Sequence, residues 1–216
     1  MSYDLVAFDF DGTLSDSEMT VLLGEEAGVA DRIAEVTERA MNDEIGYAES
    51  LRRRTALLSG LPDEEAELAF GAVELRPGTG DLLRALDRAG VRTAILTGGF
   101  DRGVDRALSA ADADVDRIIA NSLPVANGEL TGDVTGPLIE GTKDDALADL
   151  CAEWGTDLDR AVAVGDGAND LPMLEVAGLA VGYEPKPAVE PACDVVVESM
   201  DELRDLLVDR GVLSEE

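Results

Sequence analysis

Apolar and polar positions alternate along most of the chain in a pattern that predicts strands and helices in turn. Asp4–Phe10 contains a short, nearly unbroken apolar run, which is typical of a buried strand. Beyond Pro77-Gly78, short apolar runs alternate with longer segments whose apolar residues recur at helical spacing. The expected strands are Val91–Thr97, Val115–Ala120, Ala161–Gly165, Leu179–Gly182 and Val195–Val197, and the expected helices are Gly80–Ala89, Asp101–Ala111, Thr142–Trp154, Leu171–Ala177 and Met200–Arg210. The alternation predicts an α/β fold, a doubly wound parallel sheet with helices packed around it.

The block from residue 15 to residue 75 interrupts this alternation, because its patterns are helical throughout. Breaks between the expected helices fall near Gly28, Gly46 and Gly60-Leu61-Pro62. The strand before this block belongs to the same sheet as the later strands. We therefore predict an inserted helical cap, residues 15–75, and an α/β core made of residues 1–14 and 76–216.

One irregular segment lies between the expected strand that ends at Ala120 and the helix that begins at Thr142. Leu123–Val125 and Glu129–Val134 flank Asn127-Gly128, a dipeptide that favours the tight turn of a β-hairpin. We therefore predict a hairpin in this segment.

The composition excludes several classes of chemistry. The chain has no histidine, which rules out histidine zinc sites, Ser-His-Asp triads and histidine phosphatases. Cys151 and Cys193 are too few for a disulfide framework, and we expect both to be buried thiols. No apolar run approaches the roughly 18 residues that cross a bilayer, and Asp4 stands where a signal peptide carries positive charge. We therefore expect a cytoplasmic protein with no membrane contact, and the pattern carries no signal of an oligomeric state.

The charge is strongly negative and evenly spread. The net charge is −30, with 47 acidic residues against 17 basic ones, the opposite of what a nucleic-acid partner requires. Only Lys143 and Lys186 are lysines, and the other basic residues are arginines. This composition resembles that of proteins from extreme halophiles, where molar salt shortens the Debye length to about 3 Å and screens the repulsion.

Polar groups gather where four of the expected elements begin or end. Two carboxylates leave the first strand in Asp9-Phe10-Asp11-Gly12-Thr13, and a hydroxyl and glycines leave another in Thr97-Gly98-Gly99-Phe100. Lys143 opens a helix, and Gly165-Asp166-Gly167-Ala168-Asn169-Asp170 follows a third strand. Each has a plain alternative explanation on its own, namely an acidic helix cap, a glycine turn, a surviving surface lysine and a capped turn.

The four places gain meaning from the predicted fold. Doubly wound sheets bind ligands beyond the carboxyl ends of their strands, so these groups are expected at one edge. Several carboxylates so close together cannot all stay ionised without a cation. Carboxylate oxygens with open positions suit Mg²⁺, which often bridges protein carboxylates and a substrate phosphate.

These four segments, in their order and spacing, resemble the motifs of the haloacid dehalogenase superfamily. The resemblance covers the whole chain and implies a Mg²⁺-dependent phosphomonoester hydrolase that works through an aspartyl-phosphate. The resemblance implies that Asp9 is the nucleophile and Asp11 the general acid and base. It implies that the phosphoryl oxygens are bound by Thr97, the Gly98 amide and Lys143, with Asn169 near the phosphate. It implies that the metal is bound by Asp9, the Asp11 carbonyl and Asp166, with Asp170 supporting the metal and Lys143.

More narrowly, the chain resembles the phosphoserine phosphatase family, which implies O-phosphoserine as substrate and a place in serine biosynthesis. By that resemblance Arg54 binds the substrate carboxylate and Glu18 its amino group. Arg54 lies on the apolar stripe of its expected helix, unlike Arg52 and Arg53. Ser15-x-x-Glu18 is also a capping box, which is the plain explanation for Glu18. Met41 and Tyr47 match pocket-wall positions of the family, although core packing explains them equally well.

Two other functions stay open at this stage. The chain is alternatively a phosphatase or phosphotransferase of the same superfamily that acts on another small phosphorylated metabolite. More distantly, it is a catalytically silent phosphate-binding protein, although the intact set of Asp9, Asp11, Lys143 and Asp166 argues against that. The absence of a Gly-Lys phosphate loop argues against a kinase.

Overall fold

A single parallel sheet organises the computed structural model, which describes residues 3–42, 44–140 and 142–214. Within that part of the chain the sheet has six strands in the order β3-β2-β1-β6-β7-β8. They are β1 (Leu5–Phe8), β2 (Arg92–Phe100), β3 (Arg117–Asn121), β6 (Ala161–Gly165), β7 (Leu179–Tyr183) and β8 (Val195–Val197). The first strand lies in the middle, with Leu5 opposite Arg92 on one side and Ala161 on the other. The predicted doubly wound parallel sheet is confirmed.

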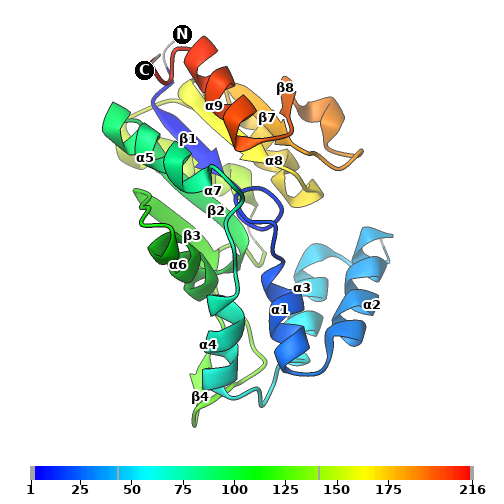
Figure 1. Ribbon diagram of the computed structural model, residues 1–216. Coiled ribbons are helices and arrows are strands. Elements are labelled where there is room, and N and C mark those ends of the chain that lie inside the picture. Colours follow the sequence, from blue (N-terminus) through cyan, green and yellow to red (C-terminus); the bar gives the residue numbers. More distant parts are fainter. Residues whose placement is uncertain (1–2, 43, 141, 215–216) are drawn as a thin grey trace.

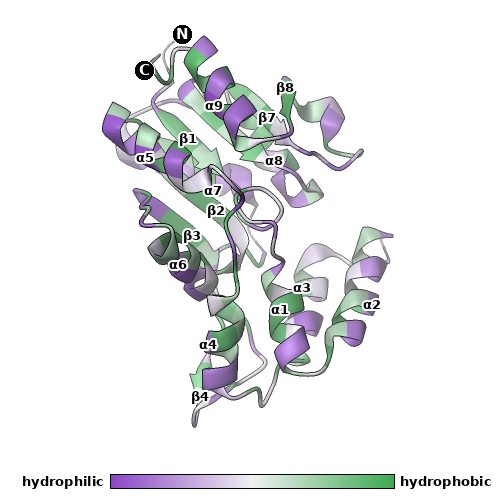
Figure 2. Cartoon of the chain, in the orientation of Figure 1, coloured by the Kyte–Doolittle hydropathy of each residue, from purple (hydrophilic) through white to green (hydrophobic). Residues whose placement is uncertain are grey.

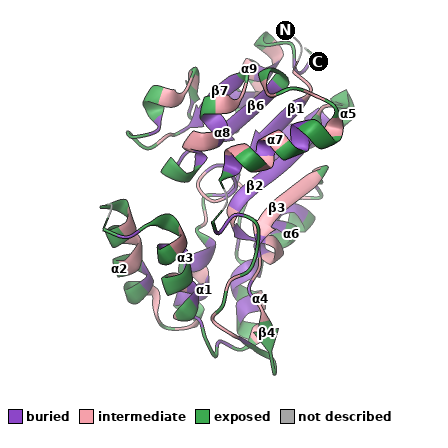
Figure 3. Ribbon diagram, turned by 180° about the vertical axis from the view of Figure 1, so that it is seen from behind, coloured by how far each residue is buried: buried purple, intermediate pink, exposed green. Residues whose placement is uncertain are grey.

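The two faces of the sheet are covered by different helices, because successive side chains of a strand point to opposite faces. Val6 and Phe8 pack into one apolar cluster and Leu5 and Ala7 into another. The first face is covered by α5 (Thr79–Ala89), α6 (Asp101–Ala110) and α9 (Met200–Asp209), and the second by α7 (Lys143–Trp154) and α8 (Leu171–Val176). Opposite views in Figures 1 and 3 show the two layers, and Figure 2 shows that the strands between them are the most apolar part of the chain.

Four helices occupy the block between β1 and α5: α1 (Met19–Glu26), α2 (Ala30–Met41), α3 (Tyr47–Ala56) and α4 (Asp63–Gly71). Gly28 and Gly60 lie between them with φ angles of +65° and +85°, a left-handed conformation that glycine adopts without strain. In Figure 1 these helices lie beyond the end to which the β1 arrow points. They therefore face the sheet edge at which the polar motifs were expected.

The cap helices differ in how they attach to the sheet domain. Helix α4 packs against the sheet domain through Phe70, whose ring lies 6.4 Å from that of Phe100, the last residue of β2, in an edge-to-face arrangement. Arg102 lies over the Phe70 ring and forms ion pairs with Asp63 and Glu67. Helix α2, in contrast, buries only Ile33 among its residues. Attachment is thus concentrated on α4, while α2 is largely exposed (Figure 3).

The predicted hairpin is present but shorter than expected. Its strands are β4 (Val125–Ala126) and β5 (Glu129–Leu130), joined by Asn127 and Gly128, both with positive φ. The Thr131 amide still donates to the Pro124 carbonyl, but Pro124 has no N–H to return a bond, so the ladder stops there. The backbone groups of Leu130 face away from β4: its amide donates to the Leu61 carbonyl, and its carbonyl accepts from the Gly60 amide. The hairpin is therefore tied to the loop between α3 and α4.

The remaining local structure consists of short 3-10 turns, η1 (Leu158–Arg160), η2 (Ala168–Asp170) and η3 (Glu190–Ala192). Among the helices of the described residues, none combines the length and apolar character that a membrane crossing requires.

Candidate active site

The end of β1 places two carboxylates at the edge of the sheet. The Asp9 amide donates to the Val164 carbonyl at 2.9 Å, so Asp9 continues the pairing of β1 with β6 before the chain turns. Gly12 makes the turn with φ +89°, and a Cβ there would stand 2.8 Å from the Asp166 carboxyl group. Glycine is thus needed twice over, for its conformation and for the close approach of Asp166.

Lys143 joins two of the acidic motifs. It is the first residue of α7, its side chain is buried, and its ammonium donates to Oδ1 of both Asp9 and Asp170. The other oxygen of Asp170 accepts from the amides of Asp166 and Gly167 at 3.0 and 2.9 Å. Asp170 is therefore fixed on both sides, and it holds Lys143 and the Asp166 turn together.

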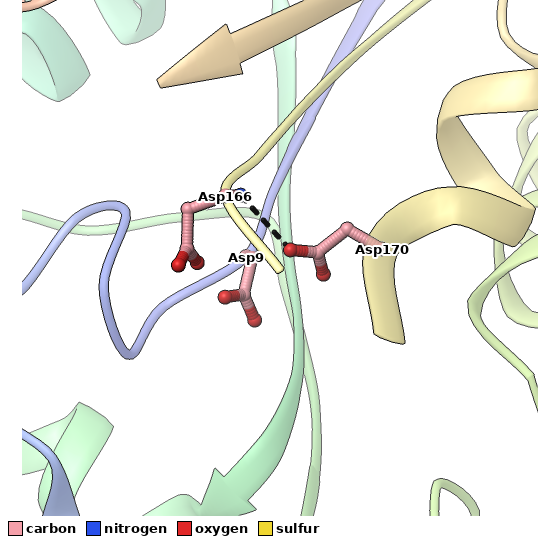
Figure 4. A group of neighbouring side chains, drawn as sticks. All are labelled: Asp9, Asp166 and Asp170. Atoms are coloured by element: carbon pink, nitrogen blue, oxygen red, sulfur yellow. Dashed lines mark hydrogen bonds between the residues drawn. The ribbon is translucent and has the colours of Figure 1, made fainter. Parts of the chain in front are cut away.

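Three buried carboxylates face one another at this edge, from Asp9, Asp166 and Asp170 (Figure 4). One oxygen from each lies within 4.8 Å of the others. When all three are ionised, the one positive charge of Lys143 offsets one of their negative charges and leaves −2 among these four side chains. A hard divalent cation fits both this charge and these oxygen donors.

The surroundings shift the proton equilibria of these groups. Burial raises the pKa of Asp9 to about 8, and Asp170 adds to this rise while Lys143 opposes it. Burial also raises the pKa of Asp11 well above its ordinary value, aided by the negative charges of Glu18 and Asp9. Burial alone would lower the pKa of Lys143, but Asp170 and Asp9 outweigh it and the pKa rises. Lys143 therefore stays cationic, while Asp11 is suited to carry a proton near neutral pH.

The glycine-rich end of β2 lies beside Asp11. The Gly99 amide donates to Thr97 Oγ1 at 2.9 Å, and a Cβ on Gly99 would stand 2.8 Å from Asp11 Oδ2. The Asn121 side chain, fully buried at the end of β3, supports this turn: it donates to the Gly98 carbonyl at 3.0 Å and accepts from the Leu138 amide at 3.1 Å. Sequence reasoning did not identify Asn121, although an asparagine at the end of an apolar strand is a usable signal.

The cap contributes Arg54 and Glu18. Arg54 donates to Thr20 Oγ1 at 3.1 Å, while its Nε is buried with no hydrogen-bond partner among the described residues. Asp11 Oδ1 is another buried atom without a partner in that part of the chain. Buried polar atoms are normally paired, so these two atoms are available to bind a polar ligand.

The capping-box explanation of Glu18 is wrong. Glu18 itself precedes the first residue of α1, and no side chain caps that helix. The Ser15 hydroxyl instead donates to the Glu74 carbonyl at 2.7 Å and accepts from the Ser17 amide. The Glu18 carboxylate lies close enough to Asp11 to raise its pKa.

Tyr47 reaches the site and Met41 does not contribute buried surface. A Cβ on Gly98 would lie 1.8 Å from the Tyr47 hydroxyl oxygen, so this hydroxyl sits directly over Gly98. Met41 is 73% exposed. Arg52 and Arg53 point elsewhere, as expected, and pair with Glu140 and Glu49.

Two further residues lie beside the acidic cluster, Asn169 in the turn after β6 and Lys186 in the loop after β7. Asn169 is exposed, and its amide group is 3.4 Å from Asp170 Oδ1. Lys186, to which sequence reasoning gave no role, places its ammonium 3.0 Å from Asp166 Oδ2. Both lysines of the chain therefore contact the acidic cluster, and the scarcity of lysine is a signal from which the contact of Lys186 could have been found.

Known proteins with similar sequences and folds agree with this geometry. A sequence model of the haloacid dehalogenase-like hydrolase family matches residues 6–175. The chain is 54% identical to the phosphoserine phosphatase of Halobacterium salinarum, over 96% of this chain and 99% of that protein. It is 40% identical to that of Streptococcus thermophilus, over 92% and 96% of the two chains.

Solved structures extend the likeness to the fold. A phospho-aspartyl intermediate analogue of phosphoserine phosphatase superimposes with a TM-score of 0.86 at 35% identity, covering 96% of this chain and 98% of that one. A substrate-bound phosphoserine phosphatase complex gives a TM-score of 0.87 at 34% identity, with the same coverage of 96% and 98%.

Proposed function

Because the chain belongs to the haloacid dehalogenase-like hydrolase family, we propose that it hydrolyses O-phosphoserine to L-serine and inorganic phosphate through an aspartyl-phosphate. It is a phosphoric monoester hydrolase, as its curated relatives are. The observation that carries the proposal is the buried arrangement of Asp9, Lys143, Asp170 and Asp166, with an unpaired oxygen of Asp11 beside it.

In the first step a carboxylate oxygen of Asp9 attacks the phosphorus atom, and the bond from phosphorus to the serine oxygen breaks. The Asp11 carboxyl group gives its proton to the departing alkoxide, a role that its raised pKa supports. In the second step the Asp11 carboxylate takes a proton from water, whose oxygen attacks phosphorus. The bond between phosphorus and Asp9 then breaks, and the Asp9 carboxylate is restored.

The phosphoryl group needs positive charge and hydrogen-bond donors around it as its own charge redistributes. Lys143 supplies a permanent cation, Thr97 a buried hydroxyl, and Gly98 a backbone amide. Asn169 adds an exposed side-chain amide from the turn that follows β6. Asn121 keeps the Gly98 turn in place through its hydrogen bond to the Gly98 carbonyl.

We propose Mg²⁺ as the metal, held by Asp9, the Asp11 carbonyl and Asp166, with Asp170 supporting the site. The mutual approach of the three carboxylates and their residual charge support a divalent cation with a preference for oxygen ligands. When bound, the ion would neutralise phosphate charge and orient the phosphoryl group.

Substrate selection is assigned to the cap, residues 15–75, and the chemistry to residues 1–14 and 76–216. Free phosphoserine carries a carboxylate and an ammonium beyond its phosphate, and Arg54 and Glu18 are cap residues of the matching signs. The unpaired Nε of Arg54 supports this assignment, since a carboxylate would satisfy it. We keep the cytoplasm as the proposed location, and a saline one, because the −30 charge calls for screening.

The proposal is tested by measuring phosphate release from phosphoserine, phosphothreonine, sugar phosphates and nucleotides in Mg²⁺ and molar KCl. Phosphoserine should give the highest kcat/KM. A clear preference for a sugar phosphate would reject the substrate while leaving the aspartyl-phosphate chemistry intact. Product analysis with added alcohols such as homoserine separates hydrolysis from transfer, since transfer would yield a new phosphate ester.

A further inference from the structure

The chain retains only two lysines, and both contact the acidic cluster. Lys143 is buried between Asp9 and Asp170, and the proposed function gives it a role. Lys186 contacts the third acid of the cluster, since its ammonium lies 3.0 Å from Asp166 Oδ2. The Asp166 side chain is 10% exposed and that of Lys186 54% exposed. The ion pair thus connects the nearly buried Asp166 carboxylate with a lysine side chain that reaches the solvent.

The backbone around Lys186 is built to present it to Asp166. The Lys186 amide donates to the Asp166 carbonyl at 2.9 Å, so the two residues are joined by main chain as well as side chain. Pro185 and Pro187 flank Lys186 and restrict the loop. A long, flexible side chain is therefore anchored at its base, beside its partner.

Arg76 fixes the same loop against the turn that follows β1. Its guanidinium forms an ion pair with Glu184 at 2.7 Å and donates to the Gly12 carbonyl at 3.1 Å. The same guanidinium lies 4.8 Å from the ring centre of Tyr183. The loop that carries Lys186 is thus held next to Gly12, against which the Asp166 carboxylate packs.

The charge balance gives Lys186 a distinct consequence. With all three carboxylates ionised, as metal binding requires, Asp9, Asp166 and Asp170 with Lys143 carry a net −2, and Lys186 reduces this to −1. A divalent cation that binds Asp166 must therefore either displace Lys186 or bind beside its positive charge. Either route weakens binding of the ion. In the metal-free protein, the positive charge of Lys186 reduces the repulsion among the carboxylates.

We propose that Lys186 is a built-in counter-cation of Asp166 that competes with the metal and sets its affinity. The inference rests on the proposed function only in taking Asp166 as a metal ligand. Lys186 stabilises the metal-free cluster by pairing with Asp166 and is displaced when Mg²⁺ binds. The affinity for Mg²⁺ is therefore lower than it would be without Lys186, and the ion can exchange. This role differs from orienting Asp166, because a residue that only oriented a ligand would strengthen metal binding.

The experiment is a calorimetric titration of the metal-free protein with Mg²⁺, without substrate. Lys186→Gln should bind Mg²⁺ about tenfold more tightly than the wild type, which corresponds to about 1.4 kcal/mol. The metal-free Lys186→Gln protein should also melt at a lower temperature than the metal-free wild type. Lys186→Arg, which keeps the charge, should restore most of the wild-type affinity.

Arg32→Gln is the matched control, since Arg32 is exposed on α2 and its loss changes the net charge equally. It should leave the Mg²⁺ affinity unchanged, and an equal gain in this variant would overturn the proposal as a general charge effect. Unchanged or weaker Mg²⁺ binding by Lys186→Gln would overturn it as well. None of these readouts needs turnover, so a failure to hydrolyse phosphoserine would leave them interpretable.

Discussion

The candidate site has a sheet side and a cap side, and the two differ in how far their polar groups are already paired within the protein. On the side of the sheet, buried Lys143 pairs with both Asp9 and Asp170, and Asp11 Oδ1 is the atom of the acidic motifs left without a partner among the described residues. On the side of the cap, Arg54 has a buried nitrogen without a partner among the described residues, and Glu18 is exposed. The sheet side is therefore preorganised for chemistry common to all phosphate esters. The cap side has bonds left to make, as expected where a particular ligand is recognised.

Packing follows the same division. Every residue of β1 is fully buried, whereas the twelve-residue helix α2 buries Ile33 alone. Segments with few buried apolar contacts open most easily. We therefore expect α2 to exchange its amide hydrogens faster than β1. The sheet side can stay rigid during turnover while the cap side adapts to the substrate.

The largest expected effect is on the sheet side. Asp9→Asn removes the proposed nucleophile and should lower kcat by at least about three orders of magnitude on every phosphate ester. Rapid-quench assays with phosphoserine and p-nitrophenyl phosphate measure this. Near-normal turnover of either ester by a correctly folded Asp9→Asn protein would exclude the proposed mechanism.

A smaller and selective effect is expected on the cap side. Arg54→Ala should raise KM for phosphoserine by roughly ten- to a hundredfold, because a desolvated Arg–carboxylate pair contributes about 1.5–3 kcal/mol. It should barely change KM for p-nitrophenyl phosphate, which has no carboxylate. Arg53→Ala is the control, since Arg53 pairs with Glu49 on the exposed side of the helix. Equal losses on both esters would make Arg54 structural.

The pH dependence of Mg²⁺ binding should depend on Asp9, which lies on the sheet side, and not on Arg54, which lies on the cap side. The pKa of Asp9 is raised from 3.8 to about 8, so the folded state favours the protonated acid. The stability that this group contributes is fully present below pH 3.8 and is lost as the pH rises through about 8. Since Mg²⁺ needs the carboxylate, its apparent affinity should fall roughly tenfold for each pH unit below that value.

Calorimetry of Mg²⁺ binding at about pH 6 and about pH 8 checks this expectation. Arg54→Ala should show the same pH dependence as the wild type, because Arg54 lies on the cap side. Asp9→Asn should show a weaker one. A pH-independent affinity in the wild type would mean that Asp9 does not exchange a proton for the metal.

The smallest effect is expected at the seam between the two sides. Glu67 on α4 pairs with Arg102 and Arg106 on α6, and these guanidinium groups lower its pKa through hydrogen bonds. Because these side chains are partly exposed, Glu67→Gln should cost only about 0.5–1 kcal/mol of unfolding free energy in urea titrations. Glu49→Gln breaks an exposed pair within α3 and should cost less. Equal costs would mean that the seam adds nothing to the attachment of α4.

Periodicity and motif order were enough to predict the sheet, its helices and the convergence of Asp9, Lys143, Asp166 and Asp170. These features depend on local pattern and on the rule that parallel strands present their ends at one edge. The contact of Lys186 with Asp166 depends on how the loop after β7 is fixed by Arg76, which no local pattern encodes. The attachment of the hairpin to the loop between α3 and α4 has the same origin, since Leu130 bonds to residues far away in the sequence.

The central position of β1 also determines when the site can exist during synthesis. Both edges of β1 are paired only after Arg92 and then Ala161, the residues opposite Leu5, have been synthesised. At ribosomal speeds of about 5–20 residues per second, that interval is on the order of ten seconds. Helices α1 to α3, whose contacts with one another are local, can form well before it ends. The apolar strand Leu5–Phe8 is meanwhile available to chaperones, and Asp9 is made well before Lys143, with which it pairs.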